Sequence, residues 1–142
     1  MSGTDEIRWQ QRLENFGKVQ ARLEDACGKP ERSFLERAGL VRYAGLAFDL
    51  AWKTLRDFLA LEGHSTKSPR EVVRQALEIS YLARQDAEIW LGYLGSRDLF
   101  SRAYIEMEAL EAERLIIRDY QPMLRRVFDS LEAGKVAKQI QG

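Results

Sequence analysis

The sequence has little of the residues that build metal centres, disulfides or covalent catalytic sites. Its 142 residues include one cysteine, Cys27, and one histidine, His64. A single cysteine excludes an intramolecular disulfide, and a zinc site needs several cysteine, histidine or carboxylate ligands. There is also no phosphate-cradling glycine loop and no dinucleotide fingerprint. We therefore expect no metal and no cofactor, with Cys27 in the core and His64 in a solvated loop.

A charge of one sign and a long apolar run are also missing. The 22 lysines and arginines balance 22 aspartates and glutamates, so the formal net charge is +0. A balanced chain has no global attraction to nucleic acid or to an anionic membrane, although a local basic patch remains open. No stretch approaches the roughly 18 apolar residues of a membrane span, and the N-terminus has no apolar signal core. These absences predict a soluble protein, and the single cysteine suits a reducing cytoplasm.

The feature that is present is hydrophobic periodicity, and its period is helical nearly throughout. The composition, 45% hydrophobic and 31% charged with 3 prolines, suits a folded helical domain. Connections between the expected helices are short, which favours antiparallel neighbours. We expect a single all-α domain over residues 1–142, an up-and-down antiparallel bundle of four to five helices. Residues 135–142, after Gly134, are expected to be a frayed tail.

The individual helices follow from the spacing of apolar residues and from local start and stop signals. The first stripe contains Trp9 and Leu13, and Gln20 lies on it and weakens it. Ser68 can cap the third helix in a capping box completed by Glu71. The expected helices cover residues 4–27, 34–62, 68–81, from 86 onward, and 106–131.

The last of these helices combines an apolar stripe with a proline. The residues expected on its inner face are Leu110, Ile117, Tyr120, Leu124, Val127 and Leu131. Pro122 lies inside it and predicts a bend or an unpaired backbone carbonyl, because proline has no N–H to donate.

Two segments carry a pattern that resembles a known family. The first runs Arg42-Tyr-Ala-Gly-Leu-Ala-Phe-Asp-Leu-Ala-Trp-Lys-Thr-Leu55, followed by Ser68-Pro-Arg-Glu-Val-Val-Arg-Gln-Ala76. The second joins Trp90-Leu91 to Arg97-Asp-Leu-Phe-Ser-Arg-Ala-Tyr104. In this order and spacing they resemble the nucleotidyltransferase substrate-binding protein family, a branch of the HEPN helical bundles. Its members typically show Phe-Glu-Leu-x-Trp-Lys-Thr-Leu, then Ser-Pro-Arg-Glu-Val, then Arg-Asn-x-x-Ser-His-x-Tyr.

The resemblance implies a homodimer and a partner, a separately encoded minimal nucleotidyltransferase. Such pairs look like toxin–antitoxin modules. It also allows a nucleotide or RNA as ligand, because in many HEPN proteins an Arg-x4-His motif forms an RNA-cleaving site across the dimer.

The sequence departs from that motif at its histidine. Arg97 matches the motif arginine, but Arg102 stands at the histidine position and Asp98 replaces the usual asparagine. Arginine stays protonated, so it cannot act as a general base, although it can bind phosphate. We therefore assign no catalytic residue. The candidate substrate- or phosphate-binding residues are Arg97, Asp98, Ser101, Arg102, Tyr104 and Lys53.

Plainer interpretations of these residues remain open. Arg97 and Arg102 could be surface arginines paired with Asp98 or with a nearby glutamate. Lys53 could be a lysine whose stem covers apolar surface beside Trp52.

Three functions follow from the resemblance. The first is a non-catalytic substrate-binding or partner subunit of a minimal nucleotidyltransferase. The second is a HEPN-type RNA-cleaving enzyme with an altered Arg-x4-His site. The third is a structural interaction protein that has lost its site.

Overall fold

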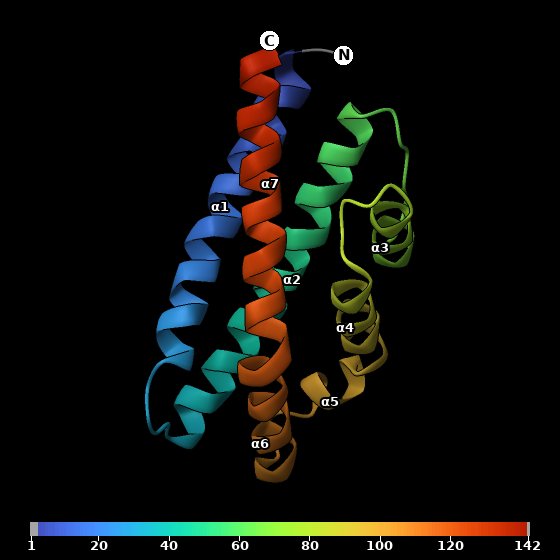
Figure 1. The fold of residues 1–142 in the computed structure, drawn as a ribbon. Coiled ribbons are helices and arrows are strands. Elements are labelled where there is room, and N and C mark those ends of the chain that lie inside the picture. Colours follow the sequence, from blue (N-terminus) through green and yellow to red (C-terminus); the bar gives the residue numbers. More distant parts are fainter. Residues whose placement is uncertain (1–2, 142) are drawn as a thin grey trace.

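A computed structural model describes residues 3–141, with side chains described over residues 3–138 (Figure 1). Within residues 3–141 every regular element is a helix and none is a strand. The elements are α1 (Gly3–Cys27), α2 (Phe34–Leu61), α3 (Pro69–Glu78), α4 (Arg84–Gly95), α5 (Arg97–Ser101), α6 (Glu106–Leu115), a π-helical turn (Ile116–Tyr120) and α7 (Gln121–Gln141).

The helices form an up-and-down bundle, which confirms the all-α prediction. In the view of Figure 1, α1 and α4 run downward, while α2 and the continuous rod of α6, the π turn and α7 run upward. Counting that rod once gives six helices in the described chain rather than four to five. The number is higher because the segment between α2 and α6 is divided into three short helices. No helix among the described residues is long and apolar enough to cross a membrane.

The start of α2 is fixed by a capping box that the sequence analysis did not single out. The Ser33 hydroxyl accepts the Glu36 backbone N–H at 3.1 Å, and the Glu36 carboxylate accepts the Ser33 N–H at 2.9 Å. The Ser33 N–H, together with a hydrogen bond from Lys29, lowers the pKa of Glu36 to about 2. Two backbone N–H groups at the start of the helix, which have no acceptor within the helix, are therefore both hydrogen-bonded.

The start of α3 is capped by Ser68 as predicted, but the second hydrogen bond of the capping box, from the Ser68 N–H to Glu71, is not formed. The Ser68 hydroxyl accepts the Glu71 N–H at 3.2 Å. The Glu71 carboxylate accepts the N–H of Lys67 at 2.8 Å instead of that of Ser68. Pro69 occupies the first turn, where a missing N–H costs nothing.

The predicted stripe of α1 lies in the core. Trp9 and Leu13 are buried, and the Cys27 side chain is half-buried against the core. Gln20 is fully buried on the same face, where its Nε2 donates to the backbone oxygen of Gln121 at 3.3 Å and to its Oε1 at 3.2 Å. Gln20, the polar residue that interrupts the apolar stripe, therefore joins α1 to the start of α7 by hydrogen bonds.

The last predicted helix contains a π turn before Pro122. Because Pro122 has no N–H, it cannot donate to the carbonyl of Arg118 as an α-helix requires. The preceding N–H, of Gln121, donates to the carbonyl of Ile116, five residues back. This wider turn changes which face of the rod is buried.

The altered register corrects two predictions. Leu110 and Ile117, predicted on the inner face, are 41% and 36% exposed. The rest of the predicted stripe is buried: Tyr120, Leu124, Val127 and Leu131. The rod also continues as α7 to Gln141 instead of ending at Leu131, so residues 135–141, predicted to fray, are helical, and Lys138 forms an ion pair with Glu62 at 2.8 Å. The part of the predicted frayed tail at residue 142 lies outside the described residues.

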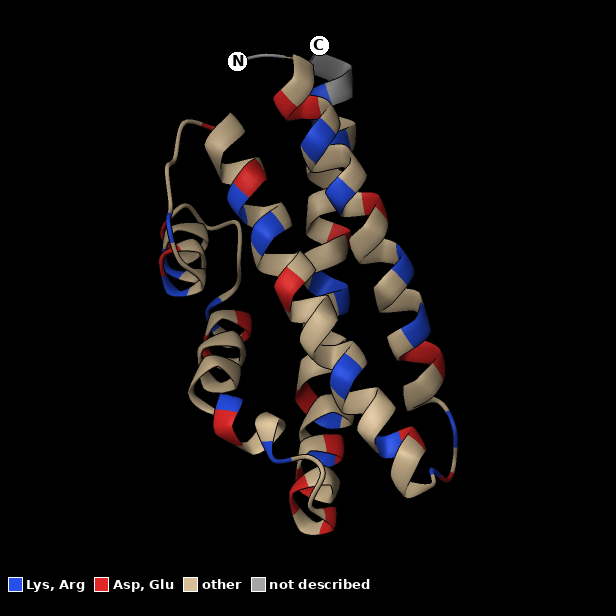
Figure 2. Cartoon of the chain, turned by 180° about the vertical axis from the view of Figure 1, so that it is seen from behind, with Lys and Arg blue, Asp and Glu red and all other residues tan. Residues whose placement is uncertain are grey.

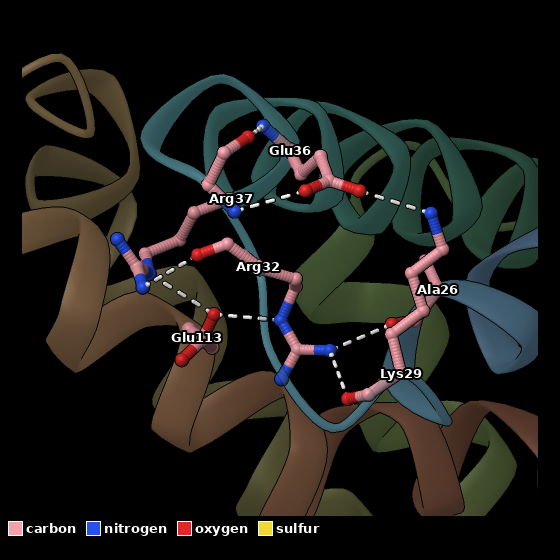
Figure 3. A network of polar contacts seen from close by, with 7 residues as sticks. Ala26, Lys29, Arg32, Glu36, Arg37 and Glu113 are labelled. Carbon is pink, nitrogen blue, oxygen red and sulfur yellow. Dashed lines mark hydrogen bonds and ion pairs between the residues drawn. The ribbon is translucent and has the colours of Figure 1, made fainter.

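Charges of both signs are mixed along the long helices (Figure 2). One group of charges is largely buried and joins the α1–α2 loop to α6 (Figure 3). Arg32 and Arg37 both donate to one oxygen of Glu113, at 2.7 and 3.0 Å. The same Arg32 guanidinium donates to the carbonyl of Ala26 at the end of α1 and to that of Lys29. The network therefore ties three segments together at one end of the bundle.

Candidate functional site

Two adjoining hollows lie between α2 and the α4–α5 segment. The inner hollow has a volume of about 160 Å³ and the outer one about 490 Å³. Both are lined by Gly45, Asp49, Tyr93 and Arg97, so they form one continuous depression. We call it the α2–α4 cleft.

The cleft forms because two helices present matching faces. Arg42, Gly45, Asp49 and Trp52 are spaced three and four residues apart, which places them on one face of α2. Trp90, Tyr93, Leu94 and Arg97 follow the same spacing along α4 and into α5. Trp52 and Trp90 line only the inner hollow and Arg42 only the outer one, whereas Tyr93 and Arg97 line both.

The floor of the cleft is a cluster of aromatic rings. The rings of Phe48 and Tyr93 are stacked with centroids 3.5 Å apart and planes 6° apart. Phe100 and Tyr120 meet the Tyr93 ring edge-on, at 5.2 and 5.5 Å. Such packing fixes the ring positions. Burial raises the pKa of Tyr93, and the nearby charge of Arg97 offsets this rise only in part, so the hydroxyl remains a donor at neutral pH.

The cleft is open partly because residue 45 has no side chain. A Cβ atom built on Gly45 would lie 3.9 Å from the Tyr93 hydroxyl. A larger side chain at this position would therefore project into the space shared by the two hollows.

The charged residues of the cleft are of two kinds. The Asp49 carboxylate accepts a hydrogen bond from Lys53 at 2.9 Å, one turn further along α2. Arg42 and Arg97 are exposed, and within residues 3–138 neither guanidinium has a hydrogen bond or ion pair to a protein group. Arg12 and Arg126, by contrast, are both bound to aspartates.

The structure brings together only some of the residues singled out from the sequence. Arg97 and Ser101 line the outer hollow, and Lys53 approaches it through Asp49. Asp98, Arg102 and Tyr104 do not line either hollow.

The candidate residues that do not line the cleft lie on or just after α5. Asp98 supplies the carbonyl that accepts the Ser101 hydroxyl at 2.9 Å, and Tyr104 is 73% exposed beyond α5. Among the ion pairs of the described residues, none joins Arg97 or Arg102 to Asp98 or to a nearby glutamate. Both arginines are exposed, so their interpretation as ordinary surface residues stands beside the phosphate-binding one.

Sequence reasoning missed four residues of the cleft, namely Arg42, Gly45, Asp49 and Tyr93. A signal for three of them was present, since positions 42, 45 and 49 share one face within the first quoted segment. Asp49 also stands where the family motif has its glutamate.

No group of three or more His, Cys, Asp or Glu side chains that could hold a metal ion occurs in the described part of the chain. His64 lies in the loop between α2 and α3, where its backbone N–H donates to the carbonyl of Leu59 at 2.8 Å, and it does not line the cleft.

Comparison with known proteins gives one family and a solved structure of the same fold. Residues 11–133 match the family described as nucleotidyltransferase substrate binding protein like. A crystal structure of a protein from Thermus thermophilus is 28% identical, covers 82% of this chain and 98% of its own, and superposes with a TM-score of 0.75. No curated protein matches. Because the family match spans most of the sequence, the chain belongs to the nucleotidyltransferase substrate-binding-protein-like family.

Proposed function

We propose that this chain is a non-catalytic subunit that docks a separately encoded minimal nucleotidyltransferase and holds a substrate for it. The observation that carries the proposal is the family match over residues 11–133. The cleft contains two arginines that form no ion pair with any carboxylate of the described residues, which supports the substrate-holding part.

The surroundings of the Arg-x4-His motif position favour binding over RNA cleavage. Arg102 replaces the motif histidine and lies outside the cleft. A protonated guanidinium does not accept a proton, so it cannot serve as the general base.

The proposal includes a homodimer working in the cytoplasm, with the pair forming a toxin–antitoxin module and the ligand being a nucleotide or RNA. The dimer is supported by apolar side chains that remain exposed from just before α6 into the π turn: Tyr104, Ile105, Met107, Leu110 and Ile117. Large apolar side chains left exposed in one stretch of chain suit a surface that a partner covers. Light scattering at micromolar concentration should give twice the chain mass of 16.4 kDa, and a monomer would contradict the dimer.

Co-expression tests the partner. The chain, carrying an affinity tag, is produced together with the small nucleotidyltransferase encoded beside its gene, and the eluate is analysed by size exclusion with light scattering. We expect a complex of fixed stoichiometry that survives the column. A neighbouring nucleotidyltransferase that elutes alone would contradict the proposal.

RNA cleavage remains the alternative because Arg97, the motif arginine, lines the cleft together with Asp49 and Tyr93. It predicts metal-independent cleavage of RNA by the purified chain and loss of that cleavage in Arg97→Ala. If the chain has only a structural role, then neither Arg97→Ala nor Arg102→Ala changes partner binding or RNA cleavage.

A further inference from the structure

We propose that α3 is a lid on the inner hollow of the α2–α4 cleft, which swings about its C-terminal end and carries Pro69 away from the hollow. The movement itself rests on how α3 is held in the bundle. Its use, to admit a ligand to the hollow or to keep one in place, rests on the proposed function.

α3 lies at the edge of the bundle, where it borders the inner hollow. Figures 1 and 2 show it beside α2, on the side of the molecule away from α1 and α7. It packs against α2 and α4, the two helices between which the hollow lies. Pro69, the first residue of α3, lines the hollow together with Trp52 and Trp90. A movement of α3 therefore changes the size of the hollow and its exposure to solvent.

Within residues 3–138, α3 is attached to the other helices by apolar contacts alone. Its buried side chains are Val72, Val73 and Ala76. No hydrogen bond or ion pair of the described residues joins a side chain of α3 to another helix, and the hydrogen bonds of Glu71 are to the adjacent residues 67–68. A segment with few buried contacts opens locally at a lower free energy than the whole chain unfolds. α3 can therefore move while the long helices stay packed.

The two ends of α3 are held differently, and this determines the direction of the movement. Just after its C-terminal end, the Tyr81 hydroxyl donates to the carbonyl of Ser130 in α7 at 2.5 Å, and the Tyr81 ring packs on that of Phe58 at 4.8 Å. The N-terminal end follows the loop of residues 63–68, whose described side chains have no hydrogen bond or ion pair to any helix other than α3. The anchored end is therefore the pivot, and the end that carries Pro69 moves.

One polar group in the loop before α3 favours the open position. The Thr66 hydroxyl is buried and has no hydrogen-bond partner among the described residues. A buried hydroxyl without a partner destabilises the state that contains it, and contact with water removes this penalty. Because the loop leads directly into α3, opening of the lid exposes Thr66 to water. The closed position is therefore less stable than its apolar contacts alone would make it.

Thiol labelling at two buried positions tests the movement. Ala76→Cys in α3 and Ala112→Cys in α6 each place one thiol at a fully buried position, in a chain whose own thiol is removed by Cys27→Ala. An opening lid exposes position 76 and leaves position 112 covered. We expect an aromatic disulfide reagent to label position 76 about a hundredfold faster than position 112. The labelling at 76 should also depend less on urea, because local opening exposes less surface than global unfolding does.

Two further measurements separate local opening from a general loss of stability. Urea unfolding checks that Ala76→Cys and Ala112→Cys have the same global stability, since a destabilised fold would be labelled faster for that reason alone. Hydrogen exchange of the unsubstituted chain should show α3 amides exchanging about a hundredfold faster than those at the centre of α2. Equal labelling of two equally stable variants, or α3 amides that exchange only through global unfolding, would overturn the proposal.

A matched pair of loop variants tests the role of the buried hydroxyl. Thr66→Val keeps the shape of the side chain and removes the unpaired group, so it should slow the labelling of position 76 about tenfold. Ser65→Ala removes a hydroxyl from the exposed neighbouring position and should not change the rate. If Thr66→Val labels as fast as Ser65→Ala, the loop does not move with α3 and the proposed swing is wrong.

A thiol on the wall of the inner hollow tests whether the movement opens the hollow. Leu94 lines the hollow from α4, so Leu94→Cys reports access to it. Its labelling should be slowed by Thr66→Val about as much as that of position 76. If Thr66→Val slows labelling at position 76 and leaves position 94 unchanged, α3 moves without opening the hollow and is not a lid.

The result is separable from that of the partner experiment, because every labelling measurement uses the chain alone. If α3 opens and no nucleotidyltransferase co-purifies, the lid stands and the proposed function fails. If the nucleotidyltransferase co-purifies and position 76 is labelled as slowly as position 112, the lid fails and the proposed function stands.

Discussion

Replacing Glu113 by glutamine tests how much the buried ionic network contributes to the fold. The Glu113 side chain is 17% exposed, and those of Arg32 and Arg37 are 8% and 14% exposed, so water screens the group poorly. Glutamine keeps the shape and an acceptor oxygen but removes the negative charge between two guanidinium groups (Figure 3). Unlike alanine, it creates no cavity, so the measured change reports the charge.

The expected magnitude follows from the two hydrogen bonds at the Glu113 oxygen. A hydrogen bond to a charged group contributes about 1.5–3 kcal/mol, and a neutral one about half as much. Two such bonds, at 2.7 and 3.0 Å, should together lose about 1.5–3 kcal/mol of unfolding free energy in Glu113→Gln. For a chain of this size that corresponds to a decrease in Tm of about 5–12 °C.

The loss should also depend on pH. Burial alone would raise the pKa of Glu113, but the hydrogen bonds and charges of Arg32 and Arg37 outweigh it and leave the pKa below its usual value. The stabilisation is therefore complete above the unfolded-state pKa of about 4.3 and is lost as the pH falls through the lower, folded-state value. The difference between wild type and variant should shrink only below about pH 4.

Urea unfolding at fixed protein concentration, followed by tryptophan fluorescence at pH 7 and pH 3, measures both effects. Glu111→Gln is the control, because Glu111 lies on the exposed side of the same helix, where its ion pair among the described residues is with the exposed Arg114. It should change stability by less than about 0.5 kcal/mol. Equal effects of Glu113→Gln and Glu111→Gln at pH 7 would refute the assignment of stability to the network.

Three further outcomes are expected. Ser33→Ala removes the cap of α2 and should cost about 1 kcal/mol in urea unfolding. Gly134→Ala should lower Tm, because the new Cβ would lie 2.9 Å from the Phe58 ring, while Gly92→Ala in open space should raise stability by about 0.5–1 kcal/mol. Burial, only partly opposed by a nearby arginine, raises the pKa of Cys27 to about 11, so at pH 8 a thiol reagent should modify it at least tenfold more slowly before urea unfolding than after.

The long helices could be predicted from the sequence because an apolar period of 3.6 is a property of each segment alone. The α1 stripe through Trp9 and Leu13 is an example, and even the buried Gln20 lies where the period puts it. The inner face of α6 could not be read in this way. A single π turn before Pro122 shifts the register, and Leu110 consequently faces outward. The start of α2 could have been predicted, because Ser33 and Glu36 have the spacing of a capping box.

The candidate site was predictable only where a motif marked a residue. In an α-helix five residues advance by about 500°, so residue 102 lies about 140° around the axis from Arg97 even in an unbroken helix. In the structure α5 ends at Ser101, and Arg102 follows its last turn outside the cleft. The second cation of the cleft is instead Arg42, which comes from α2 and which no spacing within the α5 motif could reveal.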